Sequence, residues 1–264
     1  MKSVYRWIAN HTGLCRGILF LGLTAFTIFA ASLEYVSFLS VYLIDLFIWL
    51  LVGHFIAAVP AKLLQEPIEL VDQQCDPYPL LQELEQQMAR KSNTAQGQLT
   101  ELNYAMALRT VGQNQKAAST LESINIDRFP STSPYTKYIY YNNLSDVLFA
   151  LDRVTEARIW HRKAVQIYND LPENKMKQQL SETCQISHAE ALYYEGDYSQ
   201  ALQKAAWIKC RSKRQLLDTA LLAAKCHIAL EEPEKAREKL QYVVDNGNSL
   251  HIVEESKALL ENLS

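Results

Sequence analysis

The strongest constraint on this chain is a long run near the N-terminus that contains no basic residue. From Gly17 to Ala61 there is no Lys or Arg, and the acidic residues are Glu34 and Asp45. As one helix at about 1.5 Å per residue, these 45 residues would reach roughly 68 Å, more than twice a bilayer hydrocarbon core of about 30 Å. The run therefore predicts two membrane-spanning helices.

The turn between these helices is expected where polar residues interrupt the run, at Ser32, Glu34 and Ser37. The spans would then cover about 17–33 and 38–59, within a transmembrane hairpin over 17–61 that follows a basic segment over 1–16.

Asp45 is the one acidic residue expected inside a span. A charged group near a span centre costs about 2.5–3.5 kcal/mol on insertion scales. The fifteen Leu, Ile, Val and Phe residues between Tyr35 and Ala61 together favour insertion by roughly 6 kcal/mol, so insertion is expected. We interpret Asp45 as an intramembrane polar residue that is tolerated or pairs the helices. The alternative is a role in a proton or ion path.

Basic residues flank the hairpin on both sides. Lys2, Arg6 and Arg16 precede it, and Lys62 follows it. The positive-inside rule then predicts that the N-terminus and the following domain are both cytoplasmic. In a rival interpretation, residues 2–32 form a cleaved signal peptide with a small-residue site at 30–32, which would put the domain on the other side of the membrane.

The remainder of the chain, residues 62–264, has the composition of a soluble helical protein. It holds 23 Lys and Arg residues against 27 Asp and Glu residues, a mildly acidic balance that argues against nucleic acid as a partner. The five cysteines are scattered without a paired motif and are interpreted as free thiols. Cys75 is expected to be accessible to a thiol reagent and so to report on sidedness.

Residues 62–96 are interpreted as a juxtamembrane linker and the first soluble helix. An amphipathic stretch over 62–71 is expected to break at Pro67. Asp76 followed by Pro77 is typical of a helix start, with a capping carboxylate and then a proline at the first helical position. Leu80, Leu81, Leu84 and Met88 follow at helical spacing.

Residues 97–264 contain an internal repeat of small and apolar residues. Each copy has a small or apolar pair, a turn and then an alanine, with key alanines at Ala117, Ala157, Ala201 and Ala236. Successive alanines are 40, 44 and 35 residues apart. A last helix over about 250–263 is expected to cap the stack.

These segments resemble tetratricopeptide (TPR) repeats, whose usual period is about 34 residues. The likeness covers about 97–245 and is most specific at Gly196, Asp197 and Tyr198 before Ala201. It implies an all-α fold, in which the hairpin is followed by an α-solenoid of TPR-like helix pairs. Two spans, a Cys-Asp-Pro helix start and degenerate repeats together look like membrane-bound TPR proteins of Gram-positive bacteria, which implies a bacterial plasma membrane.

Candidate chemistry outside the repeat pattern is weak. Cys184 and His188 have the spacing of a metal-binding pair, but a site needs three or four ligands, so no metal is expected. No phosphate loop or catalytic motif occurs, and we expect neither a cofactor nor enzymatic activity. A basic run over 209–214 is interpreted as an exposed, solvated loop, and the alternative is contact with anionic lipid head groups or an acidic peptide.

In a TPR-like array, the first helix of each pair lines a concave groove. The resemblance implies that the inward-facing residues include Met106, Arg109, Asn142, Asp146, Phe149, Glu190, Tyr193, Tyr194, Leu221 and Lys225. TPR domains that bind chaperone C-terminal carboxylates cluster Lys, Arg and Asn in this region, whereas Asp146 and Glu190 bring negative charge.

The leading hypothesis is a membrane-anchored scaffold that holds a protein or peptide partner at the cytoplasmic face of the lipid bilayer. The alternative is a subunit of a membrane transport or signalling complex, in which the hairpin and Asp45 are the functional part.

Overall fold

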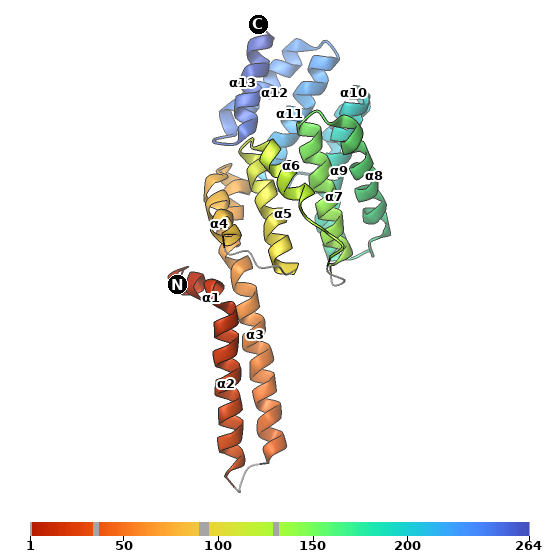
Figure 1. The fold of residues 1–264 in the computed structure, drawn as a ribbon. Coiled ribbons are helices and arrows are strands. Elements are labelled where there is room, and N and C mark those ends of the chain that lie inside the picture. Colours follow the sequence, from red (N-terminus) through yellow and green to blue (C-terminus); the bar gives the residue numbers. More distant parts are fainter. Residues whose placement is uncertain (1, 34–36, 90–94, 129–131, 264) are drawn as a thin grey trace. The chain divides into compact units, whose positions relative to one another are not determined.

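The computed structural model describes residues 2–33, 37–89, 95–128 and 132–263 (Figure 1). Over these ranges the chain forms thirteen α-helices and one short π-helix, with no strand. The all-α prediction is confirmed. The chain divides into two compact units, Met1–Pro67 and Ile68–Ser264, here called the N-terminal unit and the C-terminal unit.

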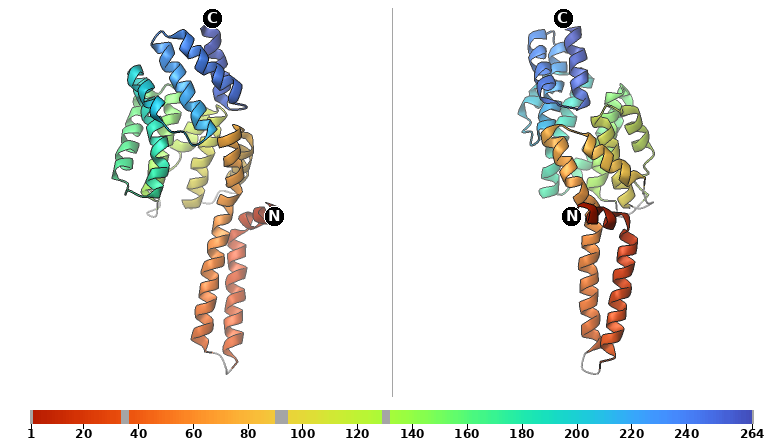
Figure 2. Two further views of the ribbon diagram at one scale, coloured as in Figure 1. Left: turned by 180° about the vertical axis from the view of Figure 1, so that it is seen from behind. Right: turned by 90° about the vertical axis from the view of Figure 1, so that its left-hand side faces the viewer.

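The N-terminal unit consists of α1 (Lys2–Asn10), α2 (Thr12–Ala31) and most of α3 (Phe38–Glu69). Figures 1 and 2 show α2 and α3 side by side in every view. Two hydrogen bonds join them: Thr27 donates to the Asp45 carboxylate, and Arg16 Nη2 donates to the Gly53 carbonyl at 3.3 Å. Glu34, expected in the turn, lies outside the described residues.

Both α2 and α3 are long and apolar enough to cross a membrane. In the most apolar window of each helix, only 11% of the residues of α2 and 18% of those of the second helix are buried. The core helix of a soluble protein would be mostly buried. Large apolar side chains such as Leu21, Ile28 and Phe47 are more than half exposed. The N-terminal unit thus presents apolar surface that the chain itself does not cover.

The second apolar helix extends well beyond its expected end. It begins at Phe38, as predicted, but continues through Pro60 and Pro67 to Glu69 and passes into the π-helix η1 (Leu70–Gln74). The expected break at Pro67 is therefore wrong. A proline removes one helical hydrogen bond, and a change to wider π-type turns is one way in which a helix accommodates a local fault. The helix ends at Cys75, whose φ of 59° is left-handed.

The C-terminal unit continues with ten α-helices. They are α4 (Tyr78–Met88), α5 (Ala95–Thr110), α6 (Asn114–Glu122), α7 (Pro134–Ala150), α8 (Val154–Asp170), α9 (Lys175–Glu195), α10 (Tyr198–Trp207), α11 (Lys213–Ala229), α12 (Pro233–Asn246) and α13 (His251–Asn262). Sequential neighbours pack together as α5 with α6, α7 with α8, α9 with α10 and α11 with α12. The first helices of successive pairs also touch, α5 against α7, α7 against α9 and α9 against α11.

The same turn joins the two helices of each pair. In each turn a backbone N–H donates to the carbonyl five residues earlier: Gln113 to Leu108, Arg153 to Leu148, Asp197 to Leu192 and Glu232 to His227, all at 2.8–3.0 Å. A residue with positive φ precedes each donor: Gly112, Asp152, Gly196 and Glu231.

The repeated turn places the four key alanines at equivalent positions. Each alanine N–H donates to the carbonyl of the turn residue four positions earlier, and each alanine is fully buried. A methyl side chain lets two helix backbones approach closely, so a larger residue there would overpack the interface.

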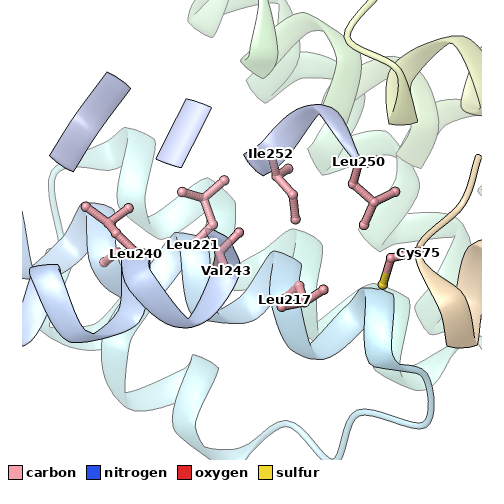
Figure 3. Packing of buried hydrophobic residues seen from close by; sticks show 8 residues of the cluster. Cys75, Leu217, Leu221, Leu240, Val243, Leu250 and Ile252 are labelled. Carbon is pink, nitrogen blue, oxygen red and sulfur yellow. The ribbon is translucent and has the colours of Figure 1, made fainter. Parts of the chain in front are cut away.

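The start of the C-terminal unit packs against its last helices. Ser249 N–H donates to the Cys75 carbonyl at 3.3 Å, and Asn248 Nδ2 donates to the Gln74 carbonyl at 3.0 Å. The Cys75 side chain is fully buried in a cluster that includes Leu217 and Leu250 (Figure 3). This contact between the two ends of the unit was not expected from the sequence.

The burial of Cys75 corrects its use as a reporter thiol. Its side chain has no exposed surface, and burial raises the pKa of the thiol, so a thiol reagent should not label the native protein at this position. A sidedness assay needs an engineered thiol at an exposed residue such as Ser123. The adjoining helix start is displaced by one residue: α4 begins at Tyr78, whose N–H donates to Asp76 Oδ1 at 3.3 Å, and Pro77 is its N-cap.

Candidate functional site

All ten side chains expected in the groove line two adjoining cavities of the C-terminal unit. The larger, of about 370 Å³, includes Met106, Arg109, Asn142, Asp146 and Glu190. The smaller, of about 170 Å³, adds Phe149, Tyr193, Tyr194, Leu221 and Lys225. Arg109, Asp146 and Glu190 line both. That this concave surface holds a ligand stays a prediction.

The groove walls come from the first helices of all four pairs. Within each of these helices the lining residues share one face, because residues three or four positions apart are neighbours on a helix. Arg109 is on α5, Asp146 on α7, Glu190 on α9 and Lys225 on α11. The start of α13 completes the wall, with Ile252 lining both cavities and Glu255 the smaller one.

The groove carries a network of ion pairs. Arg109 Nε lies 3.6 Å from Asp146 Oδ2, and both side chains are only 20% exposed. Lys225 Nζ lies 2.5 Å from Glu255 Oε1. Arg109 Nε itself has no hydrogen-bond partner among the described residues, so Arg109 acts on the neighbouring carboxylates mainly through its charge.

Burial and neighbouring charges shift the pKa values of the ionisable side chains in the groove. Burial, reinforced by Asp146, raises the pKa of Glu190 to about 8, despite the opposing charge of Arg109. Burial raises the pKa of Asp218 above its ordinary value too. For Arg109, burial alone would lower the pKa, but Asp146, Glu190 and Asp218 more than offset this and raise it.

Three charged groove residues were missed from the sequence: Asp218, Arg214 and Glu255. Arg214 Nη1 donates to Asp218 Oδ2 at 2.8 Å, and Arg214 Nε donates to Asp72 Oδ1 at 3.2 Å. Asp218 is three residues before Leu221 and seven before Lys225, so helical spacing could have placed it on the same face.

The basic run is only in part the exposed loop that was expected: Lys209 and Arg211 are exposed in the connection before α11. Lys213 and Arg214 belong to the first turn of α11. Arg214 lines the larger cavity. Arg211 Nε, outside the groove, lies 2.6 Å from Glu182 Oε1. Ser212 is the N-cap of α11, and its hydroxyl accepts a hydrogen bond from the Gln215 N–H in a capping box. The helix therefore begins at Lys213 and includes both Lys213 and Arg214.

The histidines and cysteines do not converge. In the part of the chain that the structure describes, no three His, Cys, Asp or Glu side chains are placed to hold a metal ion. His188 stacks on His161 at 6.0 Å between ring centroids, and His161 Nδ1 lies 3.2 Å from Ser187 Oγ. Burial and the neighbouring His188 lower the pKa of His161 to about 4. His161 thus stays neutral at physiological pH, as suits a packing residue.

Comparison with known protein families, curated proteins and solved structures finds no match to this chain. Function must therefore be argued from the geometry of the groove and the hairpin.

The groove predicts a distinct pH dependence of stability. Because the pKa of Glu190 is higher in the folded chain than the ordinary 4.5, its contribution to stability is fully present below about pH 4.5 and is lost as the pH rises through about 8. Replacing Glu190 with glutamine removes this contribution. Urea unfolding at several pH values should show the wild type losing more stability than Glu190→Gln between about pH 5 and pH 8. If the stability of both proteins changed equally with pH, the raised pKa of Glu190 would be contradicted.

Proposed function

We propose that this chain is a membrane-anchored TPR-like scaffold whose groove binds a segment of a partner protein, without catalysis. The observation that carries the proposal is the gathering of ten side chains from α5, α7, α9 and α11 around two adjoining cavities. Concave, partly apolar surfaces with a few converging polar groups are the usual sites of ligand binding.

The repeated turn supports the TPR-like part of the proposal. Its donor residues, Gln113, Arg153, Asp197 and Glu232, follow one another at the same unequal intervals as the key alanines. A solenoid of helix pairs is the arrangement in which each repeat contacts its neighbours and the first helices form one surface.

The N-terminal unit supports the membrane part. Its two long apolar helices expose large apolar side chains, which a bilayer would cover. Basic residues at both ends of the hairpin favour a cytoplasmic N-terminus and C-terminal unit. The likeness to membrane-bound TPR proteins of Gram-positive bacteria makes a bacterial plasma membrane our proposed location.

Asp45 has a partner within the hairpin. Its side chain is 5% exposed and accepts a hydrogen bond from Thr27 on the other helix. This contact favours the helix-pairing interpretation over a proton or ion path. A transport or signalling role for the hairpin stays the alternative proposal.

A co-purification experiment tests the scaffold. Tagged full-length protein is extracted from its native membranes in mild detergent, and bound proteins are quantified for the wild type, an Asp146→Asn/Tyr193→Ala groove variant and an Asp45→Leu variant. We expect a partner that the wild type and Asp45→Leu retain equally and the groove variant loses by about tenfold or more. A partner lost with Asp45→Leu but kept by the groove variant would favour the alternative.

A further inference from the structure

The groove has an uneven charge balance. Among the described residues, its lining holds four carboxylates, Asp146, Glu190, Asp218 and Glu255, and three cationic side chains, Arg109, Arg214 and Lys225. Each cation is already engaged: Arg109 with Asp146, Lys225 with Glu255, and Arg214 with both Asp218 and Asp72. Among the described side chains, Glu190 alone of these carboxylates has no ion pair within 4 Å.

Glu190 lies where the two cavities meet, since it lines both. It sits on α9 one turn before Tyr194 and therefore on the same helix face. Tyr194 stacks on Phe149 of α7 with 4.5 Å between ring centroids and 9° between ring planes. An unpaired carboxylate beside aromatic rings is the combination that binds ammonium and guanidinium groups, through charge and through the ring faces.

We propose that the groove selects a positively charged segment of the partner protein, with a lysine or arginine side chain seated against Glu190 beside Tyr194 and Phe149. This rests on the proposed function and names the chemistry of its partner. The lining disfavours the opposite charge, because an acidic segment would meet four carboxylates and no unengaged cation among the described residues.

The shape of the site favours a polypeptide over a small amine. The two cavities, about 370 Å³ and about 170 Å³, adjoin along four helices, so a lone ammonium group would leave most of the surface uncovered. The apolar side chains of Met106, Leu221 and Ile252 provide contacts for the aliphatic stems of basic residues and for their neighbours.

Binding of charged peptides to the full chain in an uncharged detergent tests the proposal. The probes are fluorescein-labelled decapeptides of alternating Ala and Lys, Ala and Gln, or Ala and Glu, measured by fluorescence anisotropy at constant salt and at about pH 9, where Glu190, with a pKa of about 8, is ionised. We expect the lysine peptide to bind at least about tenfold more tightly than the glutamine peptide, and the glutamate peptide to bind most weakly. Spermidine, a polyamine without a polypeptide backbone, should compete only at much higher concentration.

The variant Glu190→Gln should weaken the lysine peptide by about tenfold and leave the glutamine peptide unchanged. The matched control is Glu238→Gln on α12, whose side chain is 75% exposed and paired with Lys239, and it should change neither affinity. Unfolding midpoints of both variants check that they fold.

Each of the other outcomes contradicts one specific part of the proposal. Equal binding of the lysine and glutamine peptides, or an unaffected Glu190→Gln, overturns the charge selection but leaves the peptide groove standing. Spermidine competing as strongly as the lysine peptide overturns the polypeptide ligand. Absence of binding by all three peptides contradicts the proposed function itself.

Discussion

Replacing Arg109 with methionine should lower the free energy of unfolding of the C-terminal unit by about 3 kcal/mol at neutral pH. Arg109 is the cation that faces Asp146 and, at longer range, Glu190 and Asp218. Methionine keeps much of the volume but leaves the partly buried Asp146 without its paired cation. Urea unfolding of the full chain in a neutral detergent, followed by circular dichroism, measures the loss.

The control for this prediction is an arginine whose ion pairs are exposed. Arg153 pairs with Glu122 and Glu156, whose side chains are 43% and 52% exposed, so Arg153→Met should cost no more than about 1 kcal/mol. Adding Asp146→Asn to the Arg109→Met variant should restore part of the lost stability. Similar losses for the Arg109 and Arg153 variants would show that the groove charges are well solvated.

Replacing Leu240 with alanine should cost about 2–5 kcal/mol. Leu240 is fully buried on α12, in the cluster that also holds Cys75, Leu217 and Val243 (Figure 3). Truncation removes apolar contacts and leaves a cavity between α11 and α12, in the part of the cluster near Leu221 and Val243 (Figure 3). The same urea titration measures the cost.

A second consequence follows from the position of Cys75 in this cluster. The loss of packing in Leu240→Ala should destabilise the whole cluster, which includes Cys75. Labelling of Cys75 by a thiol reagent should therefore be faster in the variant than in the wild type. The control, Leu216→Ala, removes a side chain that is 46% exposed and should change stability by about 0.5 kcal/mol or less. A Leu240→Ala loss as small as that of the control would contradict the packing of this cluster.

The helical fold and the groove positions could be anticipated because both follow from local periodicity. The spacing of Ala117, Ala157, Ala201 and Ala236 marks where two helices approach closely, and the structure buries all four. The resemblance to TPR repeats then implied inward-facing positions for residues such as Asp146 and Glu190, which lie on the first helix of their pairs. The start of the second apolar helix at Phe38 could also be predicted from nearby residues, since polar residues precede it.

What the sequence could not predict depends on long-range contacts. The pairing of Arg214 with Asp72 joins residues 142 positions apart, and that of Ser249 with the Cys75 carbonyl joins residues 174 apart. No periodic pattern encodes such a contact. The passage of α3 through Pro67 was missed for a different reason, because proline disfavours but does not forbid helix.

Site-specific photo-crosslinking in native membranes tests the central claim most directly, that a membrane-anchored groove holds a partner protein. A benzophenone amino acid is placed at Met106 or Tyr193, which line the groove, or at Ile159 on α8, whose side chain is 56% exposed. We expect the same partner to be crosslinked in the membrane fraction from both groove positions, in competition with excess alternating Ala-Lys peptide, and not from Ile159. Crosslinking from Ile159 with none from either groove position would contradict the claim.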